Sequence, residues 1–205
     1  MRNKYYFFLM AVICISFTAC TARGKTVIFN DSSGIALLII DIQNEYFEGG
    51  KHTLYNPLEA LKNAEDILRR FRQFESFPII HVQHHNSRGA GFFEEGTWGA
   101  QIHDNLTPLE NEIVITKRQV SSFAGTNLEE VLRERNVKSL VIVGMQTNVC
   151  VETTIKDSKM KELGIRVTVL EDACAALNEQ THNSAIERIR DENVFIVKTE
   201  IFKGI

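Results

Sequence analysis

One cysteine of the sequence lies where a reactive thiol is expected. Cys150 follows residues 139–143, an apolar, β-branched run that predicts a buried strand. Gly144 is expected to end this strand, and Thr147 or Asn148 to cap a helix, which places Cys150 in the first helical turn. The helix dipole and free N–H groups there favour the thiolate, the reactive form of cysteine. The alternative is a small, inert, buried side chain.

Two charged residues follow other predicted strands at equivalent places. Asp41 comes directly after residues 35–40, and Lys117 comes directly after residues 112–116. A carboxylate at the end of an apolar run is partly desolvated and needs a charge partner, which Lys117 supplies. Asp41 would then act as general base toward the Cys150 thiol. An isolated Asp–Lys pair is more commonly a plain ion pair, but three reactive side chains at equivalent strand ends favour catalysis.

Strands and helices alternate along the body of the chain. The predicted strands are 35–40, 78–83, 112–116, 139–143, 166–170 and 194–197, and the predicted helices are 57–77, 127–135, 148–163 and 180–190. This alternation predicts an α/β fold, a three-layer sandwich whose six-stranded, mostly parallel, doubly wound sheet carries helices on both faces. The first and fourth strands then flank the crevice where ligands bind. Residues 84–106, long and polar, are a candidate active-site loop.

Composition excludes several classes of protein. The 205 residues suit one domain, and a net charge of -3 without a Lys/Arg cluster argues against nucleic-acid binding. The four cysteines form neither a CxxC pair nor the spacing of a disulfide framework. A dinucleotide-binding module needs a glycine-rich turn after the first strand, and residues 41–44 contain no glycine.

The N-terminus predicts export. A basic start precedes the apolar residues 5–17, which are too short to span a bilayer but suit a signal peptide. Thr18-Ala19-Cys20 resembles the cleavage site of bacterial lipoproteins, although Phe17 replaces the usual leucine. We therefore expect a signal peptide over 1–20, lipidation of Cys20, a tether over 21–34 and one folded domain over 35–205. The protein would be extracytoplasmic and touch the membrane only through this lipid. Cleavage near Ala22 and an uncleaved anchor are the alternatives.

Over residues 34–200 the sequence resembles the isochorismatase-like cysteine hydrolases, which include nicotinamidases and N-carbamoylsarcosine amidase. The resemblance is carried by residues 36–44, Lys117 with 121–128, and 144–151. It implies a catalytic triad of Asp41, Lys117 and Cys150. It also implies a cis peptide bond between Met145 and Gln146, with the N–H groups of Gln146 and Cys150 turned toward an oxyanion.

The chemistry implied by the resemblance is acyl transfer through a Cys150 thioester, with a small-molecule substrate and no cofactor. Family members without this cysteine hydrolyse a vinyl ether, so its presence favours cleavage of an amide or ureido C–N bond. A vinyl ether hydrolase and a non-catalytic surface lipoprotein that keeps the fold as a scaffold are the alternatives. Family members commonly associate, so we expect a homo-oligomer.

The resemblance also bears on metal binding. Metal-dependent nicotinamidases carry an Asp-x-His pair after the first strand, and residues 48–54 contain none. His81, His84 and His85 are the alternative zinc ligands. However, His81 alternates within a strand and the other two are adjacent on a loop, so we expect no metal.

The remaining candidates concern the substrate pocket. Residues 91–99 resemble the pocket-side loop of metal-free members. Phe47, Trp98 and Phe123 are candidate pocket walls, with core packing as the alternative. Gln43 is a candidate for positioning substrate, with capping as the alternative. Cys174 is expected to be structural, with a role as redox partner of Cys150 as the alternative.

Overall fold

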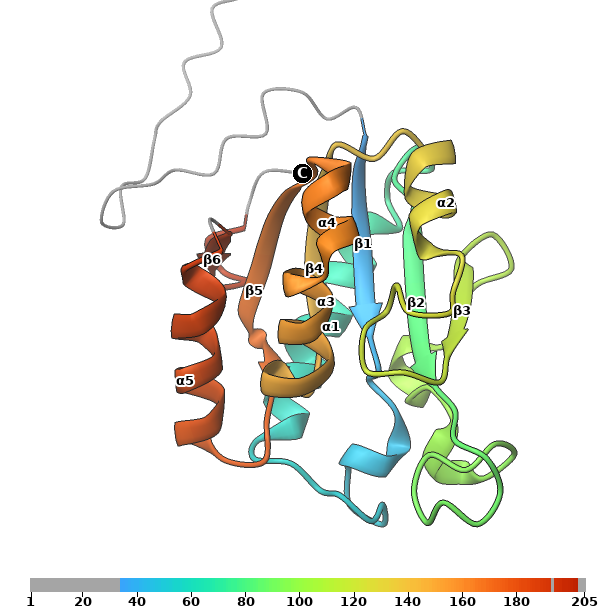
Figure 1. Ribbon diagram of the computed structural model, residues 1–205. Coiled ribbons are helices and arrows are strands. Elements are labelled where there is room, and N and C mark those ends of the chain that lie inside the picture. Colours follow the sequence, from blue (N-terminus) through green and yellow to red (C-terminus); the bar gives the residue numbers. More distant parts are fainter. Residues whose placement is uncertain (1–33, 193, 203–205) are drawn as a thin grey trace, which may run out of the picture.

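The computed structural model describes residues 34–192 and 194–202 (Figure 1). Its sheet has the order β3-β2-β1-β4-β5-β6, and every pairing in it is parallel. The strands are β1 Ile35–Ile40, β2 Ile79–His84, β3 Ile113–Lys117, β4 Ser139–Met145, β5 Arg166–Ala175 and β6 Phe195–Val197. The order runs outward in both directions from β1 and β4, so the point where it reverses lies between these two strands. The predicted doubly wound sheet is confirmed.

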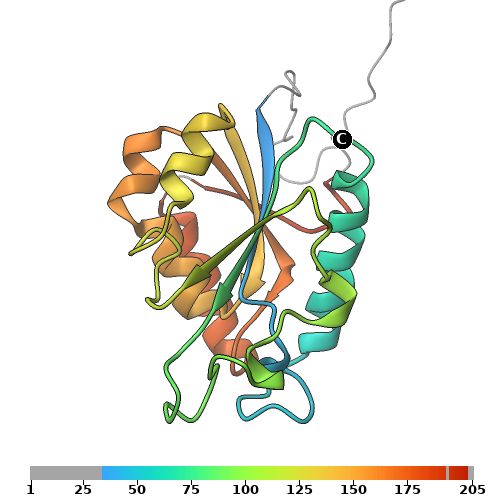
Figure 2. The same cartoon turned by 90° about the vertical axis from the view of Figure 1, so that its right-hand side faces the viewer.

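Helices cover both faces of the sheet, as Figures 1 and 2 show from two directions. One face carries α1 (Pro57–Phe71). The other carries α2 (Leu128–Glu134), α3 (Glu152–Lys156), α4 (Ser158–Leu163) and α5 (Glu179–Arg190). The short 3-10 helices are η1 (Asn44–Tyr46), η2 (Trp98–Ala100) and η3 (Asp104–Leu106). The arrangement is the predicted three-layer sandwich.

Strand β1 joins the two halves of the core. All six of its side chains are buried, because a central parallel strand is covered on both faces. Alternate residues point to opposite faces. Ile35, Leu37 and Ile39 pack in the cluster with α1, and the other three pack with α2, α3 and α4. Asp41, the next residue, therefore follows a strand whose position is fixed by packing on both faces.

Several boundaries differ from those predicted. Helix α1 ends at Phe71 rather than at residue 77, and two tight turns follow, closed by the Phe74 and Phe77 N–H groups. Pro78 disfavours helical backbone at residue 77, which argues against the predicted end there. Strand β5 continues to Ala175, past the predicted end at residue 170, with a register shift against β4.

The predicted helix 148–163 is three separate pieces. A π-helical turn, Thr147–Val151, comes first and contains Cys150; α3 and α4 follow. Asp157 separates α3 from α4, since its backbone is extended and its side chain caps α4 by accepting the Lys159 N–H. Cys150 lies in a first helical turn, as predicted, but this turn is π-helical and is not continuous with one long helix.

The predicted signal peptide over 1–20, with Cys20, lies outside the described residues, as does the tether up to residue 33. Export, lipidation and a lipid anchor stay predictions. Among residues 34–192 and 194–202, no helix has the length and apolar character needed to cross a membrane.

Gly144 lets β4 approach β1 closely. It pairs in register with Ile40, and a Cβ atom at Gly144 would lie 2.4 Å from the Ile40 carbonyl oxygen and 2.8 Å from the Ile40 Cβ. Neither neighbour can move without shifting the strand that leads to Asp41. A glycine is therefore needed here for space.

Gly144→Ala is expected to destabilise the fold by about 1–3 kcal/mol, the cost of overpacking a close-packed core, beyond the loss in Gly125→Ala. Gly125 is the matched control because its φ is +70° and a Cβ there meets open space. Chemical denaturation gives both free energies of unfolding. Equal losses in the two variants would contradict the steric account.

Candidate functional site

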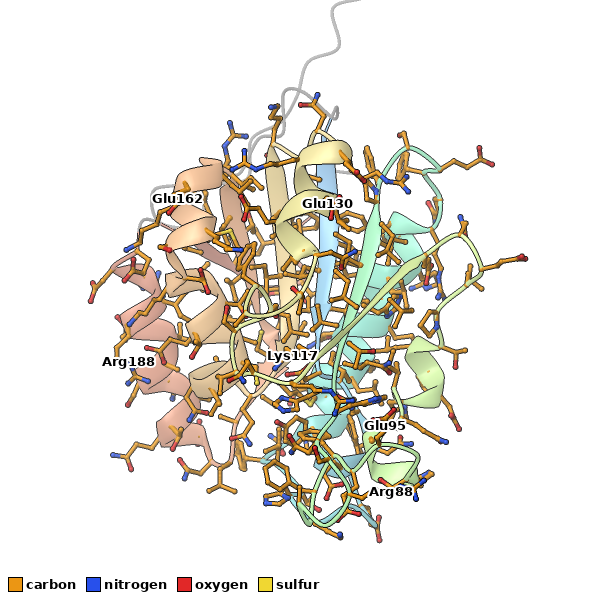
Figure 3. All side chains as sticks on the ribbon, turned by 45° about the vertical axis from the view of Figure 1, so that its right-hand side comes forward. Arg88, Glu95, Lys117, Glu130, Glu162 and Arg188 are labelled. Atoms are coloured by element: carbon orange, nitrogen blue, oxygen red, sulfur yellow. The ribbon has the colours of Figure 1, made fainter. Side chains whose placement is uncertain are left out.

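Three predicted catalytic side chains meet at the carboxyl edge of the sheet. Asp41 follows β1 with a left-handed backbone (φ 51°), Lys117 ends β3, and Cys150 lies in the turn after β4. Asp41 is 0% exposed, Lys117 1% and Cys150 4%. Figure 3 shows Lys117 deep among the side chains, whereas Arg88 and Glu95 lie on the outer loop.

The Lys117 ammonium lies between the other two groups. Its Nζ is 2.8 Å from Asp41 Oδ2 and 3.2 Å from Cys150 Sγ. The carbonyl oxygens of Gln119 and Val120 accept from the same Nζ at 3.0 and 3.1 Å. Neither Asp41 oxygen accepts a well-aligned hydrogen bond from the described residues, so both keep lone pairs open to a proton. The arrangement is an acid–base pair held around one buried positive charge.

Burial sets the protonation of the nucleophile. Desolvation, reinforced by the negative charge of Asp41, raises the pKa of Cys150 to about 12, although Lys117 opposes the shift. Desolvation also raises the pKa of Asp41, again against the influence of Lys117. The two groups disfavour each other's negative charge, so they share one proton, which rests on the thiol. The expectation that a helix start favours the thiolate at rest is therefore wrong.

The structure adds His84, which the sequence analysis weighed only as a zinc ligand. His84 ends β2 and pairs in register with Lys117, and its Nδ1 lies 3.1 Å from Lys117 Nζ. Burial, then the charge of Lys117, lower the pKa of His84. Its place in the sequence could have indicated this contact, since His84 ends a strand that neighbours β3 in a doubly wound sheet.

Asp41, His84 and Cys150 each offer a metal-ligand atom, and these atoms lie within 4.8 Å of one another. Lys117 Nζ, however, contacts all three residues. A metal ion among them would stand against a positive charge that already holds that space. The donor set therefore fits an ammonium better than a metal ion.

Aromatic side chains line one side of the triad. Tyr46 and Phe93 are buried with ring centroids 5.1 Å apart, and Phe93 stacks on His84 at 5.5 Å. Burial, then the nearby charges of Cys150 and Asp41, raise the pKa of Tyr46 well above its usual value. Neither ring is predicted from the sequence, since neither contact follows from the spacing of residues along the chain.

The predicted pocket residues lie in different places. Phe123 is buried in the core cluster that contains Cys150. Phe47 is buried against His103, with ring centroids 4.5 Å apart. Trp98 is 51% exposed, and Gln43 uses its amide on the backbone of His84 and Ala100. Gln43 therefore ties the end of β2 to η2, and its amide points to the protein.

The peptide bond between Met145 and Gln146 is cis. The Gln146 carbonyl accepts from the N–H groups of Val149 and Val151 at 3.1 and 3.2 Å, which closes the turn around Cys150. Thr147 Oγ1 lies 2.9 Å from Nδ1 of His182 on α5. Cys150 and Cys174 are both free thiols.

The triad is closed off from solvent. Two cavities among the described residues, of about 660 and 330 Å3, lie beside α1 and β5, and none of the three residues lines either of them. All three side chains are buried, so the site as described has little contact with solvent.

The comparison with protein families decides the membership. Residues 35–201 match the isochorismatase domain. The chain belongs to the isochorismatase family. It is accordingly a hydrolase.

Relatives agree with this assignment. An uncharacterized isochorismatase family protein, YddQ of Bacillus subtilis, is 41% identical over 74% of this chain and 83% of its own. Nicotinamidase 3 of Arabidopsis thaliana is 32% identical over 74% and 78%. The crystal structure of an isochorismatase from Pseudomonas putida superposes with a TM-score of 0.74 at 32% identity, covering 82% of this chain and 89% of that one.

The raised pKa predicts how Cys150 reacts with iodoacetamide. With a pKa of about 12, the alkylation rate should rise about tenfold per pH unit between about pH 7 and 10, without a plateau, because only the thiolate reacts. The same cysteine in the denatured protein should level off near its ordinary pKa of about 8.5. Mass spectrometry of the Cys150 peptide gives both rates. A plateau below about pH 8 in the folded protein would show a resting thiolate and contradict the account.

Proposed function

We propose that this hydrolase cleaves the C–N bond of a small amide or ureido compound through a thioester on Cys150. The observation that carries the proposal is the contact of one ammonium with both a carboxylate and a thiol, at 2.8 and 3.2 Å, out of solvent. Nucleophilic catalysis by a weakly acidic thiol needs an adjacent base, and Asp41 lies close enough to serve. The relative named nicotinamidase supports an amide as the substrate class.

In the proposed first half-reaction, Asp41 takes the thiol proton while Sγ bonds to the carbonyl carbon. The carbonyl oxygen gains negative charge, which the N–H groups of Gln146 and Cys150 stabilise. Asp41 then returns the proton to the nitrogen, the C–N bond breaks, and ammonia or an amine leaves. The thioester remains on Cys150.

In the second half-reaction, Asp41 takes a proton from water while the water oxygen bonds to the thioester carbon. The C–S bond breaks, sulfur recovers the proton, and a carboxylic acid or carbamate leaves. Lys117 stays charged throughout and offsets whichever of Asp41 or Cys150 carries the negative charge. The chemistry uses side chains of this chain alone.

The burial of the site indicates what kind of substrate it can take. Because the triad is buried, the substrate we propose is a small molecule that the surrounding loops can enclose. Association into a homo-oligomer stays a prediction.

The test is a hydrolysis screen of the full chain against primary amides, ureido acids and vinyl ethers, with and without chelator. Cys150→Ala, Asp41→Asn and Lys117→Met are each expected to lower kcat by at least about 10³-fold, as when members of a catalytic unit are removed. Cys174→Ala is the matched control, since Cys174 is the other free, buried cysteine among the described residues, and it should retain activity. Chelation should change nothing.

Two outcomes would contradict the proposal. Amide hydrolysis that survives Cys150→Ala would remove the thioester from the mechanism. Turnover of vinyl ethers alone would assign the chain to the other reaction of the family.

A further inference from the structure

The Lys117 ammonium has more acceptors around it than protons to give. It carries three N–H donors. Beside Asp41 Oδ2 and Cys150 Sγ, it contacts two backbone carbonyl oxygens and Nδ1 of His84 at 3.1 Å. The direction of its N–H bonds, and thus of its positive charge, depends on which acceptors are present.

The hydrogen bonds of His84 determine its tautomer. An ammonium can only donate, so Nδ1 of His84 must accept from Lys117. The proton of the neutral ring then lies on Nε2, which donates to Asn86 Oδ1 at 3.0 Å. His84 therefore presents a neutral acceptor to Lys117.

His84 is fixed through both its backbone and its ring. Its N–H donates to Gln43 Oε1 at 2.7 Å, and its carbonyl accepts from Gln43 Nε2 at 2.9 Å. Its ring stacks on Phe93 with the planes 17° apart. Gln43 lies two residues after Asp41, so the segment that carries the base also fixes the histidine. A side chain held this firmly presents its acceptor at a fixed point.

We propose that His84 is a positioning residue that aims the Lys117 ammonium at Asp41 and Cys150. By accepting one N–H bond it fixes the rotation of the ammonium, so that the other two protons lie on the side of the carboxylate, the sulfur and the two carbonyl oxygens. Because the acceptor is neutral, the positive charge stays available to the pair that shares the moving proton. A carboxylate at this position would neutralise Lys117 and disfavour the thiolate. The inference rests on the proposed function of the triad.

Three substitutions of His84 separate these effects. His84→Phe keeps a ring against Phe93 and removes the acceptor. His84→Asn places an amide oxygen on the same δ1 branch as the lost nitrogen, and His84→Asp has the same shape with a negative charge. His85→Phe is the matched control, because it makes the same change one residue further on.

The readouts are the rate of Cys150 alkylation by iodoacetamide at fixed pH and, for an amide that the screen identifies, kcat and KM. His84→Phe should lower the alkylation rate and kcat by up to about 100-fold, as expected for a misplaced catalytic group, with little change in KM. His84→Asn should retain most of both rates, and His84→Asp should be slow. His85→Phe should match the wild type.

The proposal is overturned if His84→Phe behaves as His85→Phe does, or if His84→Asn is as slow as His84→Phe. Thermal unfolding of each variant is measured alongside. If His84→Phe does not fold, the test rests on His84→Asn and His84→Asp, which have the same shape and differ in charge. Equal rates in these two variants would overturn the requirement for a neutral acceptor. Alkylation needs no substrate, so this test stands apart from the proposed function, which fails if amide turnover survives Cys150→Ala or if only vinyl ethers are turned over.

Discussion

The buried ion pair between Asp41 and Lys117 is the constraint on which the site depends. Removing two charges from water costs several kcal/mol each, and the attraction between them offsets that cost only with good geometry and further hydrogen bonds. Asp41 is fixed because β1 is buried on both faces. Lys117 is fixed by two carbonyl oxygens and His84. The packing of the sheet and the hydrogen bonds at its edge therefore maintain a charge arrangement that neither residue would keep alone.

The same burial explains why the nucleophile rests as a thiol. A Cys150 thiolate would be a second negative charge beside Asp41, with only one ammonium to balance both. Cys150 therefore keeps its proton until its sulfur can bond to the carbonyl carbon of a substrate. A raised pKa makes Asp41 a stronger base than an exposed aspartate, and a raised pKa makes the thiolate, once formed, a stronger nucleophile. A site that is closed and protonated at rest is also protected from oxidation. In the proposed mechanism, reactivity arises only when substrate is bound.

Much of the fold could be predicted from the sequence. The apolar runs predicted all six strands, and their alternation with helices predicted a mostly parallel sheet. The ends of three strands placed Asp41, Lys117 and Cys150 at one edge. Periodicity failed where local geometry decided the structure. The turn around Cys150 is π-helical and the following helix breaks at Asp157, although the apolar spacing runs on unchanged. His84 and Tyr46 were missed because their contacts depend on which strands and loops become neighbours. The partners of Gln43 could not be predicted either, because they are backbone atoms distant in sequence.

The most direct test of the central claim is infrared spectroscopy of the S–H stretch at neutral pH. The difference spectrum between the Cys174→Ala protein and the Cys150→Ala, Cys174→Ala protein isolates the contribution of Cys150. We predict an S–H band in this difference that shifts in heavy water, as a thiol beside an ionised Asp41 requires. No S–H band from Cys150 in the folded protein would mean a thiolate at rest, and would contradict the shared-proton site described above.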